Sequence, residues 1–514
     1  MRNIVVLVVA LLATSVYAQE SDVEEIVIVG STIKNGFSDP ETDNLAIEAI
    51  EPIKVYAPGG RGGFIGATLN GTDVKNTAVF RNGIPINDPG SGWYDFGVDI
   101  PSYQSYKVIS GPNSVLFGSS SMAGTVLIED DYWQDVLYVK GGEDQNYVMF
   151  GNKHILVSRY DGSNGSVMTD NNEEDRFKNA TLKSRMEWKG FKMNSVLTDY
   201  EYDYDNCYAV DWSNTDDCIQ KGTKMNTSIR NDWLTLGYSR NDSRHLSAGD
   251  KTWQSDNNRY YIDAKESIGD FLLGATYQKE SYNDLEDERP AVYVNWQREF
   301  IGLGYRREED TNIFRFGLDL KGVKFSLGNS FRSPNLYERF GDDWVGANPS
   351  LKPEEGKGAE ISYAKFTAWR YEFDEGIDFD FMDYQYINSG EYTSTGIKYA
   401  NHIITENGSW YVLAQYTDTD KIRVPKYQTK ISYYNGWNNF DYLIEYVGAY
   451  DKGLEFDGRP IDDMSTFNLN VGYYFDKKYR LGLQVKDLLN RHFEILPGYS
   501  AGGREITLSL DISI

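Results

Sequence analysis

The sequence has little cysteine, proline or positive charge, and each shortage excludes a class of protein. Two cysteines among 514 residues exclude a disulfide scaffold and a multi-cysteine metal or iron–sulfur centre. The chain carries 51 Lys and Arg against 77 Asp and Glu, a formal net charge of −26, which argues against a nucleic-acid partner because such proteins need a basic face. Beyond the first residues no apolar run approaches the length of a membrane-spanning helix, about 18 residues.

Aromatic residues and glycine are abundant instead. The chain contains 39 Tyr, 24 Phe and 11 Trp together with 48 Gly, but only 14 Pro. A polar, acidic chain of this composition is typical of extensive antiparallel β-sheet.

The first 18 residues have the features of a secretory signal peptide. Arg2 precedes the apolar run at residues 4–13, and Ala18 ends a small-residue cleavage pattern. A run this short does not span a bilayer as a helix. We therefore expect residues 1–18 to be removed on export.

From about residue 132 to the end, the dominant pattern is an alternation with period two. Apolar and polar or small residues alternate in five segments, 301–306, 314–321, 467–473, 481–486 and 506–514. Successive side chains of a strand point to opposite faces. One face of these strands is therefore apolar and the other polar.

Two architectures satisfy this pattern. A soluble sandwich would bury the apolar face, whereas an outer-membrane barrel would turn it towards lipid and keep a polar interior. Export, acidity and about 22 candidate strands in residues 132–514, each long enough to cross a membrane, favour the barrel. The predicted fold class is all-β, an antiparallel transmembrane barrel of about 22 strands.

Residues 19–131 form a different unit, rich in glycine and short apolar pieces. The segment EEIVIVGS at residues 24–31 could add a strand to the sheet edge of a partner, or be an ordinary first strand of this unit. The glycine-rich loop at residues 58–63 lacks the Gly-Lys-Ser/Thr ending of a phosphate loop, so no nucleotide site is expected.

Several motifs then resemble those of TonB-dependent outer-membrane receptors. In the N-terminal unit they are NTAVFRNGIPINDPG (76–90) and VISGPNSVLFGSSSMAGTVLIED (108–130). In the barrel region they are FRSPNLYERFG (331–341), NPSLKPEEGKGAEI (348–361) and the C-terminal residues 485–513. Ser110 and Asn70 depart from the pattern, because each occupies a position where the family usually has Arg.

The resemblance implies an organisation and a mechanism. Residues 19–44 would hold the TonB box and a linker, residues 45–131 a plug inside the lumen, and residues 132–514 the barrel. The protein would lie in the bacterial outer membrane as a monomer surrounded by lipid, and import a scarce nutrient with proton-motive force delivered by TonB with ExbB–ExbD. The residues implied to pair with TonB are Glu24, Glu25, Ile26, Val27, Ile28 and Val29.

Within the family, the compact barrel and the ending GYSAGGREITLSL most resemble cobalamin (vitamin B12) receptors. A receptor for a siderophore or another metal chelate is the alternative within transport. A passive porin or an adhesin is the alternative from another class. An enzyme is not expected, because no catalytic signature is present and the four histidines have no metal-ligand spacing.

An acidic loop holds both cysteines, Cys207 and Cys218, which can pair in an oxidising envelope. Its carboxylates at residues 199–217 are compatible with a calcium site or with a solvated acidic loop. The resemblance to cobalamin receptors favours calcium, although Met168 and Asn172 are poorer ligands than the Gln and Asp usual there. The implied ligands are Asp161, Asp170, Asn172, Tyr204, Asp205 and Asp216. The resemblance also implies Asn87 in the plug and Arg423 in a late loop as substrate contacts.

Overall fold

The structure is a computed structural model of the whole chain. It describes residues 32–34, 54–56, 65–99, 104–130, 135–143, 145–163, 175–204, 207–208, 214–215, 218–247, 250–342, 344–454, 458–476, 478–497, 499–500 and 503–513. The predicted signal peptide and TonB box lie outside the described residues.

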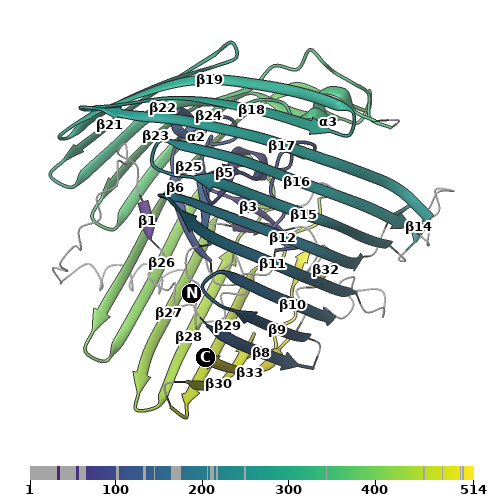
Figure 1. Ribbon diagram of the computed structural model, residues 1–514, viewed down its shortest axis with the longest axis vertical. Coiled ribbons are helices and arrows are strands. Elements are labelled where there is room, and N and C mark those ends of the chain that lie inside the picture. Colours follow the sequence, from purple (N-terminus) through teal and green to yellow (C-terminus); the bar gives the residue numbers. More distant parts are fainter. Residues whose placement is uncertain are drawn as a thin grey trace.

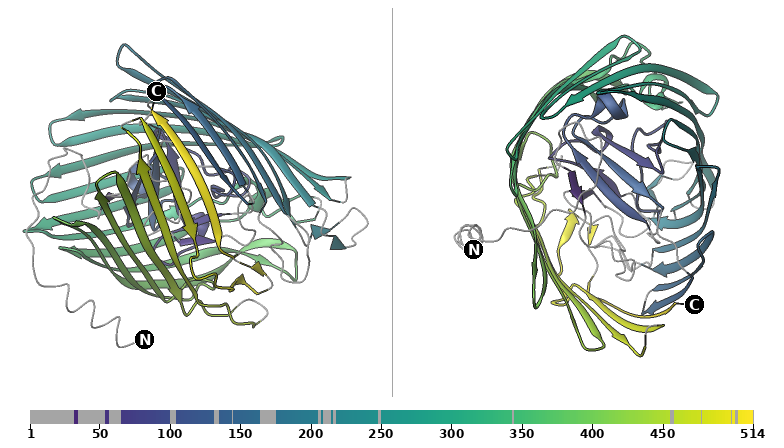
Figure 2. Two further views of the ribbon diagram at one scale, coloured as in Figure 1. Left: turned by 90° about the horizontal axis from the view of Figure 1, so that it is seen from below. Right: turned by 60° about the vertical axis from the view of Figure 1, so that its left-hand side comes forward.

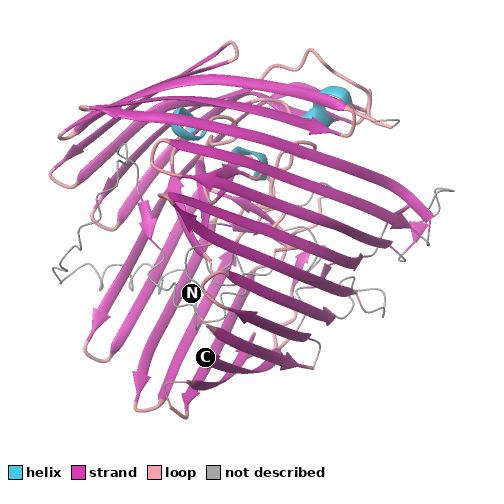
Figure 3. Ribbon diagram, in the orientation of Figure 1, coloured by secondary structure: helices cyan, strands magenta, loops and turns pink. Residues whose placement is uncertain are grey.

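Twenty-two antiparallel strands form a closed barrel, in which the last strand pairs with the first through Ser513 and Val136 (Figures 1 and 3). The strands are β8 (Val136–Gly142), β9 (Gln145–Gly151), β10 (Ile155–Ser163), β11 (Arg176–Trp188), β12 (Phe191–Tyr204), β15 (Cys218–Arg230), β16 (Leu234–Ser247), β17 (Asp250–Ile268), β18 (Phe271–Tyr282), β19 (Leu285–Arg298), β20 (Ile301–Glu308), β21 (Thr311–Leu320), β22 (Val323–Arg332), β23 (Glu354–Tyr363), β24 (Phe366–Asp380), β25 (Gln385–Thr405), β26 (Gly408–Thr419), β27 (Tyr427–Trp437), β28 (Phe440–Tyr450), β29 (Met464–Tyr474), β30 (Tyr479–Lys486) and β33 (Glu505–Ser513). Closure leaves no unpaired strand edge.

The alternation of the sequence corresponds to the two faces of the wall. On β33, Leu508 and Leu510 are exposed on the outside, whereas Thr507 and Asp511 are buried towards the lumen. On β11, Leu182 is exposed and its neighbour Lys183 is fully buried. The apolar face therefore points away from the lumen, as a barrel in lipid requires. The predicted fold class is confirmed.

The two rims of the barrel differ, and this difference orients it. One rim is built from tight turns, such as Lys189–Gly190 and Lys321–Gly322, whose residues all have positive φ as type I′ hairpin turns require. The opposite rim carries the long connections, including residues 333–353 between β22 and β23. Outer-membrane barrels have short periplasmic turns and longer extracellular loops. The rim with residues 333–353 is therefore extracellular.

A small sheet fills the lumen (Figure 2). Its order is β1 (Thr32–Lys34), β6 (Ser105–Ser110), β7 (Gly124–Glu129), β4 (Thr77–Arg81) and β5 (Ile84–Pro85), and a separate pair joins β2 (Lys54–Tyr56) to β3 (Gly66–Thr68). Two further short pairs join β13 (Cys207–Tyr208) to β14 (Asn214–Thr215) and β31 (Glu494–Leu496) to β32 (Tyr499–Ser500). The plug ends with β7 and the barrel begins with β8.

The helices are short: η2 (Val74–Asn76) and α2 (Ser114–Phe117) in the plug, and α3 (Leu336–Phe340) in the extracellular connection. In the described part of the chain, no helix has the length and apolar character needed to cross a membrane. The plug core includes Val79, Phe80 and Val126, and it continues into the inner wall of the barrel through Trp369 and Tyr371. Plug and wall therefore share one apolar core.

Candidate functional site

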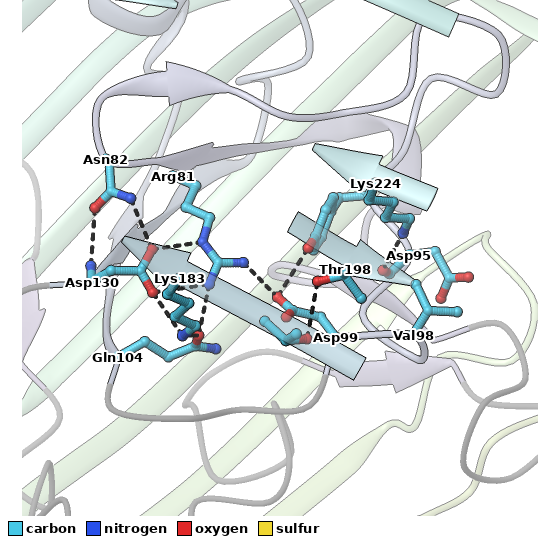
Figure 4. A network of polar contacts seen from close by, with 12 residues as sticks. Arg81, Asn82, Asp95, Val98, Asp99, Gln104, Asp130, Lys183, Thr198 and Lys224 are labelled. Atoms are coloured by element: carbon cyan, nitrogen blue, oxygen red, sulfur yellow. Dashed lines mark hydrogen bonds and ion pairs between the residues drawn. The ribbon is translucent and has the colours of Figure 1, made fainter. Parts of the chain in front are cut away.

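A buried cluster of charges joins the plug to the wall of the barrel (Figure 4). Arg81, at the end of β4, donates to Asp130 from Nε at 2.7 Å, and Lys183 of β11 donates to the other oxygen of the same carboxylate at 2.8 Å. The side chains of all three residues are at most 1% exposed. Because an unpaired buried charge is very unfavourable, this arrangement requires the plug carboxylate and the wall ammonium to remain together.

Two further plug residues complete the cluster. Arg81 also donates to Asp99 at 2.9 Å and to Gln104 at 3.0 Å, and Lys183 donates to Gln104 at 2.8 Å. Burial opposes the charged form of Arg81, but Asp130 and Asp99 outweigh it and raise the pKa of this guanidinium well above its ordinary value. Burial likewise opposes ionisation of Asp130, yet Arg81 and Lys183 hold the pKa of its carboxyl below the ordinary range. The cluster is therefore ionised at neutral pH.

The two departures from the family motifs meet in one place. Asn70 donates to Ser110 at 2.9 Å and to the Tyr371 hydroxyl at 3.1 Å, and Ser110 donates to Glu360 of β23 at 2.7 Å. Neutral side chains of the plug thus reach a wall carboxylate where the family usually places Arg. Arg315 of β21 bonds Asn113 of the plug close by.

At the extracellular end, a chain of ion pairs links the plug to α3 and to the wall. Lys75 of η2 donates to Glu338 at 2.7 Å, and Arg332 donates to Glu338 at 2.8 Å and to Glu354 at 2.7 Å. Glu338 also closes a capping box with Asn335, which explains why α3 begins there. Burial raises the pKa of Glu338, but Arg332 and Lys75 outweigh it and lower this pKa to about 2.

The plug loop at residues 88–93 lies directly against this helix. The Leu336 amide donates to the Pro89 carbonyl at 3.1 Å, and a Cβ added at Gly92 would lie 2.9 Å from the Asn335 side-chain nitrogen. Asp88 accepts hydrogen bonds from Asn241 and Asn257 of the wall. The extracellular surface of the plug is thus held from several sides.

The predicted substrate residues occupy different environments. Asn87 is buried, and its amide accepts from Val79 at 2.7 Å and donates to the Thr77 carbonyl at 3.0 Å. This side chain stabilises the plug loop from within. Arg423 lies in the connection between β26 and β27 with φ of 63°. The structure does not bring these two residues together by any printed contact, so their roles as ligand contacts stay predictions.

Only part of the predicted calcium site can be described. Asp161 and Tyr204 lie near the extracellular ends of β10 and β12, whereas Asp170, Asn172, Asp205 and Asp216 lie outside the described residues. No group of three metal-ligating side chains occurs within the residues that are described. Cys218 is buried at the start of β15, but the side chain of Cys207 lies outside the described part. The calcium site and the disulfide stay predictions, as does the TonB box at residues 24–29.

Most of these contact residues were not predicted individually, yet the recognised motifs contain them. The run at 76–90 supplies Arg81, the run at 108–130 supplies Ser110 and Asp130, and FRSPNLYERFG supplies Arg332 and Glu338. The family motifs therefore coincide with the interface between plug and wall. Lys183 and Lys75 lie outside those motifs, and only their lumenal and apical positions reveal them.

A closed barrel with an apolar outer face and a polar, plug-filled lumen defines an outer-membrane transport receptor. Residues 56–488 match the family described as TonB dependent receptor-like, beta-barrel, and the chain belongs to this family. It is therefore an outer-membrane protein of Gram-negative bacteria. Members of this family are transport receptors for small molecules rather than enzymes, and they interact with TonB.

Solved structures share the fold at low sequence identity. The siderophore receptor PirA from Acinetobacter baumannii has a TM-score of 0.71 and 14% identity, with 94% of this chain and 98% of that chain covered. The ferric enterobactin receptor PfeA from Pseudomonas aeruginosa has a TM-score of 0.67 and 12% identity, with 95% and 100% covered. The siderophore receptor PiuA from Acinetobacter baumannii has a TM-score of 0.67 and 14% identity, with 90% and 92% covered.

Proposed function

We propose that this receptor imports a siderophore-type metal chelate across the outer membrane, with energy that TonB and ExbB–ExbD deliver to residues 24–29. The observation that carries the proposal is the plug held in the lumen by buried ion pairs, such as Asp130 with Lys183. Ligand that reaches the extracellular face of the plug cannot pass until these contacts are rearranged. The chain offers no recognisable nucleotide site, so the work must come from a partner.

The same contacts argue against a passive porin or an adhesin. A porin needs a water-filled channel, whereas this lumen contains a folded sheet whose apolar core continues into the wall at Trp369 and Tyr371. An adhesin would have no use for ionised groups buried between plug and wall. Deletion of residues 19–131 would leave either alternative functional, and it would abolish regulated import.

The choice of substrate class rests on the structural neighbours. The similar structures are named as siderophore receptors, and one is named as a receptor for ferric enterobactin. At 12–15% identity this likeness supports the fold, and it favours a metal chelate over cobalamin only as the more economical hypothesis.

Cobalamin is the second candidate, because the segment GYSAGGREITLSL at residues 498–510 resembles the ending of cobalamin receptors. Tight extracellular connections such as Asn283–Asp284 and Glu309–Asp310 also give the compact barrel that this resemblance implies. Calcium bound by the acidic loops would belong to this second candidate.

Growth of a bacterial host that lacks its own receptors tests the proposal. We expect the chain to restore growth on a ferric chelate as sole iron source, and to fail in a host without TonB. A matched strain that needs cobalamin tests the second candidate in parallel. Rescue by trace cobalamin alone would replace the chelate with cobalamin, and rescue without TonB would refute active import.

A further inference from the structure

A cluster of exposed aromatic side chains lies at the extracellular tip of the β24–β25 hairpin. Phe381 is 75% exposed, Met382 89% and Tyr384 60%. The rings of Phe381 and Tyr384 lie 5.0 and 6.0 Å from the ring of Phe379. We call Phe379, Phe381, Tyr384 and Tyr386 the hairpin rings.

The hairpin rings belong to the lumenal side of the wall. Phe379 is the direct cross-strand partner of Tyr386, and their rings are 5.2 Å apart. Tyr386 in turn lies 6.1 Å from Tyr337 of α3, and Lys75 of the plug lies 5.3 Å from its ring. Since a lipid-facing aromatic girdle would point outward, contact with lipid does not explain these rings.

A ladder of rings therefore leads from the hairpin tip down to the plug. From Tyr337 the ladder continues to Tyr282 at 6.0 Å, and Lys75 lies 5.5 Å from the ring of Trp93. Exposed apolar side chains gathered in one place mark a binding surface. Rings stack edge to face or offset on other rings, so this surface is suited to a ligand that carries planar rings.

Positive charge lies at the foot of the ladder. Lys75 is paired with Glu338, which it shares with Arg332, and the side chain of Asp73 caps η2 beside it. Lys421 lies 4.2 Å from the ring of Tyr392, whose hydroxyl accepts from Asn76 of η2. In the described part of the chain no carboxylate pairs with the Lys421 ammonium. This cation is thus available to a negatively charged ligand beside the plug.

We propose that the hairpin rings bind the planar aromatic groups of an anionic metal chelate, and that Lys421 attracts its negative charge at the surface of the plug. The inference rests on the proposed function and deepens it, because it selects chelates with aromatic rings, such as ferric catecholates, over ring-free ferric hydroxamates.

Binding to the purified full-length receptor tests the inference. Equilibrium dialysis with radioactive iron would compare the ferric complexes of dihydroxybenzoate and of acetohydroxamate. We expect tighter binding of the catecholate. The double variant Phe381→Ala with Tyr384→Ala should weaken it at least about ten-fold, because two stacking contacts are lost, and should leave the hydroxamate unchanged. Lys421→Gln should weaken the catecholate as well.

Phe475→Ala is the matched control, because Phe475 is an exposed aromatic residue on the periplasmic rim. It should bind both chelates as the unchanged receptor does. Equal affinity for both chelates, or a double variant that retains catecholate binding, would overturn the inference. TonB-dependent uptake of the hydroxamate alone would also overturn it while leaving the proposed function intact, whereas absence of TonB-dependent uptake of any chelate would refute the proposed function itself.

Discussion

Replacement of Lys183 by Met measures how strongly the barrel holds its plug. Lys183 is fully buried and donates to Asp130 and Gln104 at 2.8 Å each. Removal of one member of a buried ion pair costs about 3–5 kcal/mol. Here Arg81 still compensates Asp130 and still donates to Gln104. We therefore expect the lower end of this range, about 3 kcal/mol.

Lys178→Met is the matched control on the same strand. The Lys178 side chain is 45% exposed and pairs with Glu201 at 3.2 Å. A solvent-exposed pair of this kind contributes at most about 1 kcal/mol. Both variants remove a lysine from β11, so they differ mainly in contact with the plug.

Scanning calorimetry of the purified receptor provides the readout. For a unit of 60–100 residues, each kcal/mol corresponds to a shift of about 4–8 °C. We expect the plug transition of Lys183→Met to fall by on the order of 10 °C or more, and that of Lys178→Met to change by only a few degrees. If both variants melt together with the unchanged receptor, the buried cluster does not hold the plug and the reasoning fails.

Three further outcomes follow from the coupling segment, the apical ion pairs and the acidic loop. Ile28→Pro should abolish energised uptake but leave ligand binding intact, because proline removes a ladder donor; uptake assays with a binding control decide this. Glu338 has a pKa lowered to about 2, so its stabilisation is present above about pH 4.5 and is lost as the pH falls towards 2. The difference in melting temperature between the unchanged receptor and Glu338→Gln should stay constant from pH 8 to about pH 5 and shrink below it; a difference that changes near pH 7 would contradict this assignment. If the acidic loops bind calcium, excess chelator should increase protease cleavage near Asp205 and weaken substrate binding, and an unchanged digest would remove that site.

The barrel was predictable from the sequence because its signal is local. In Leu481-Gly482-Leu483-Gln484 the alternation assigns each side chain to a face, and the structure exposes both leucines and turns Gly482 and Gln484 towards the lumen. A strand that crosses a membrane between lipid and a filled lumen must show such a period. About 22 strands could therefore be counted without any tertiary information.

The interface between plug and wall was not predictable in the same way. The period of β11 places Lys183 opposite to Leu182, on the lumenal face, but no local pattern states that Asp130, 53 residues earlier, will meet it. That pairing depends on how the plug is rotated in the barrel. Likewise, Asn87 stands in a recognisable motif, yet only the fold shows that its amide is engaged by the plug backbone.

The plug is held differently on different sides of the lumen, and this difference bears on transport. Against β11 the contacts are polar, as in the hydrogen bond from Asn179 to the Val98 carbonyl at 2.6 Å. Against β24 and β25 they are aromatic, as in the stacked Phe373 and Tyr392, which share the buried core of the plug. Water can replace the polar partners, but it cannot replace apolar contacts. Separation of the plug from the wall therefore costs less on the β11 side, and the two strands that keep the tighter hold also carry the hairpin rings at the extracellular surface.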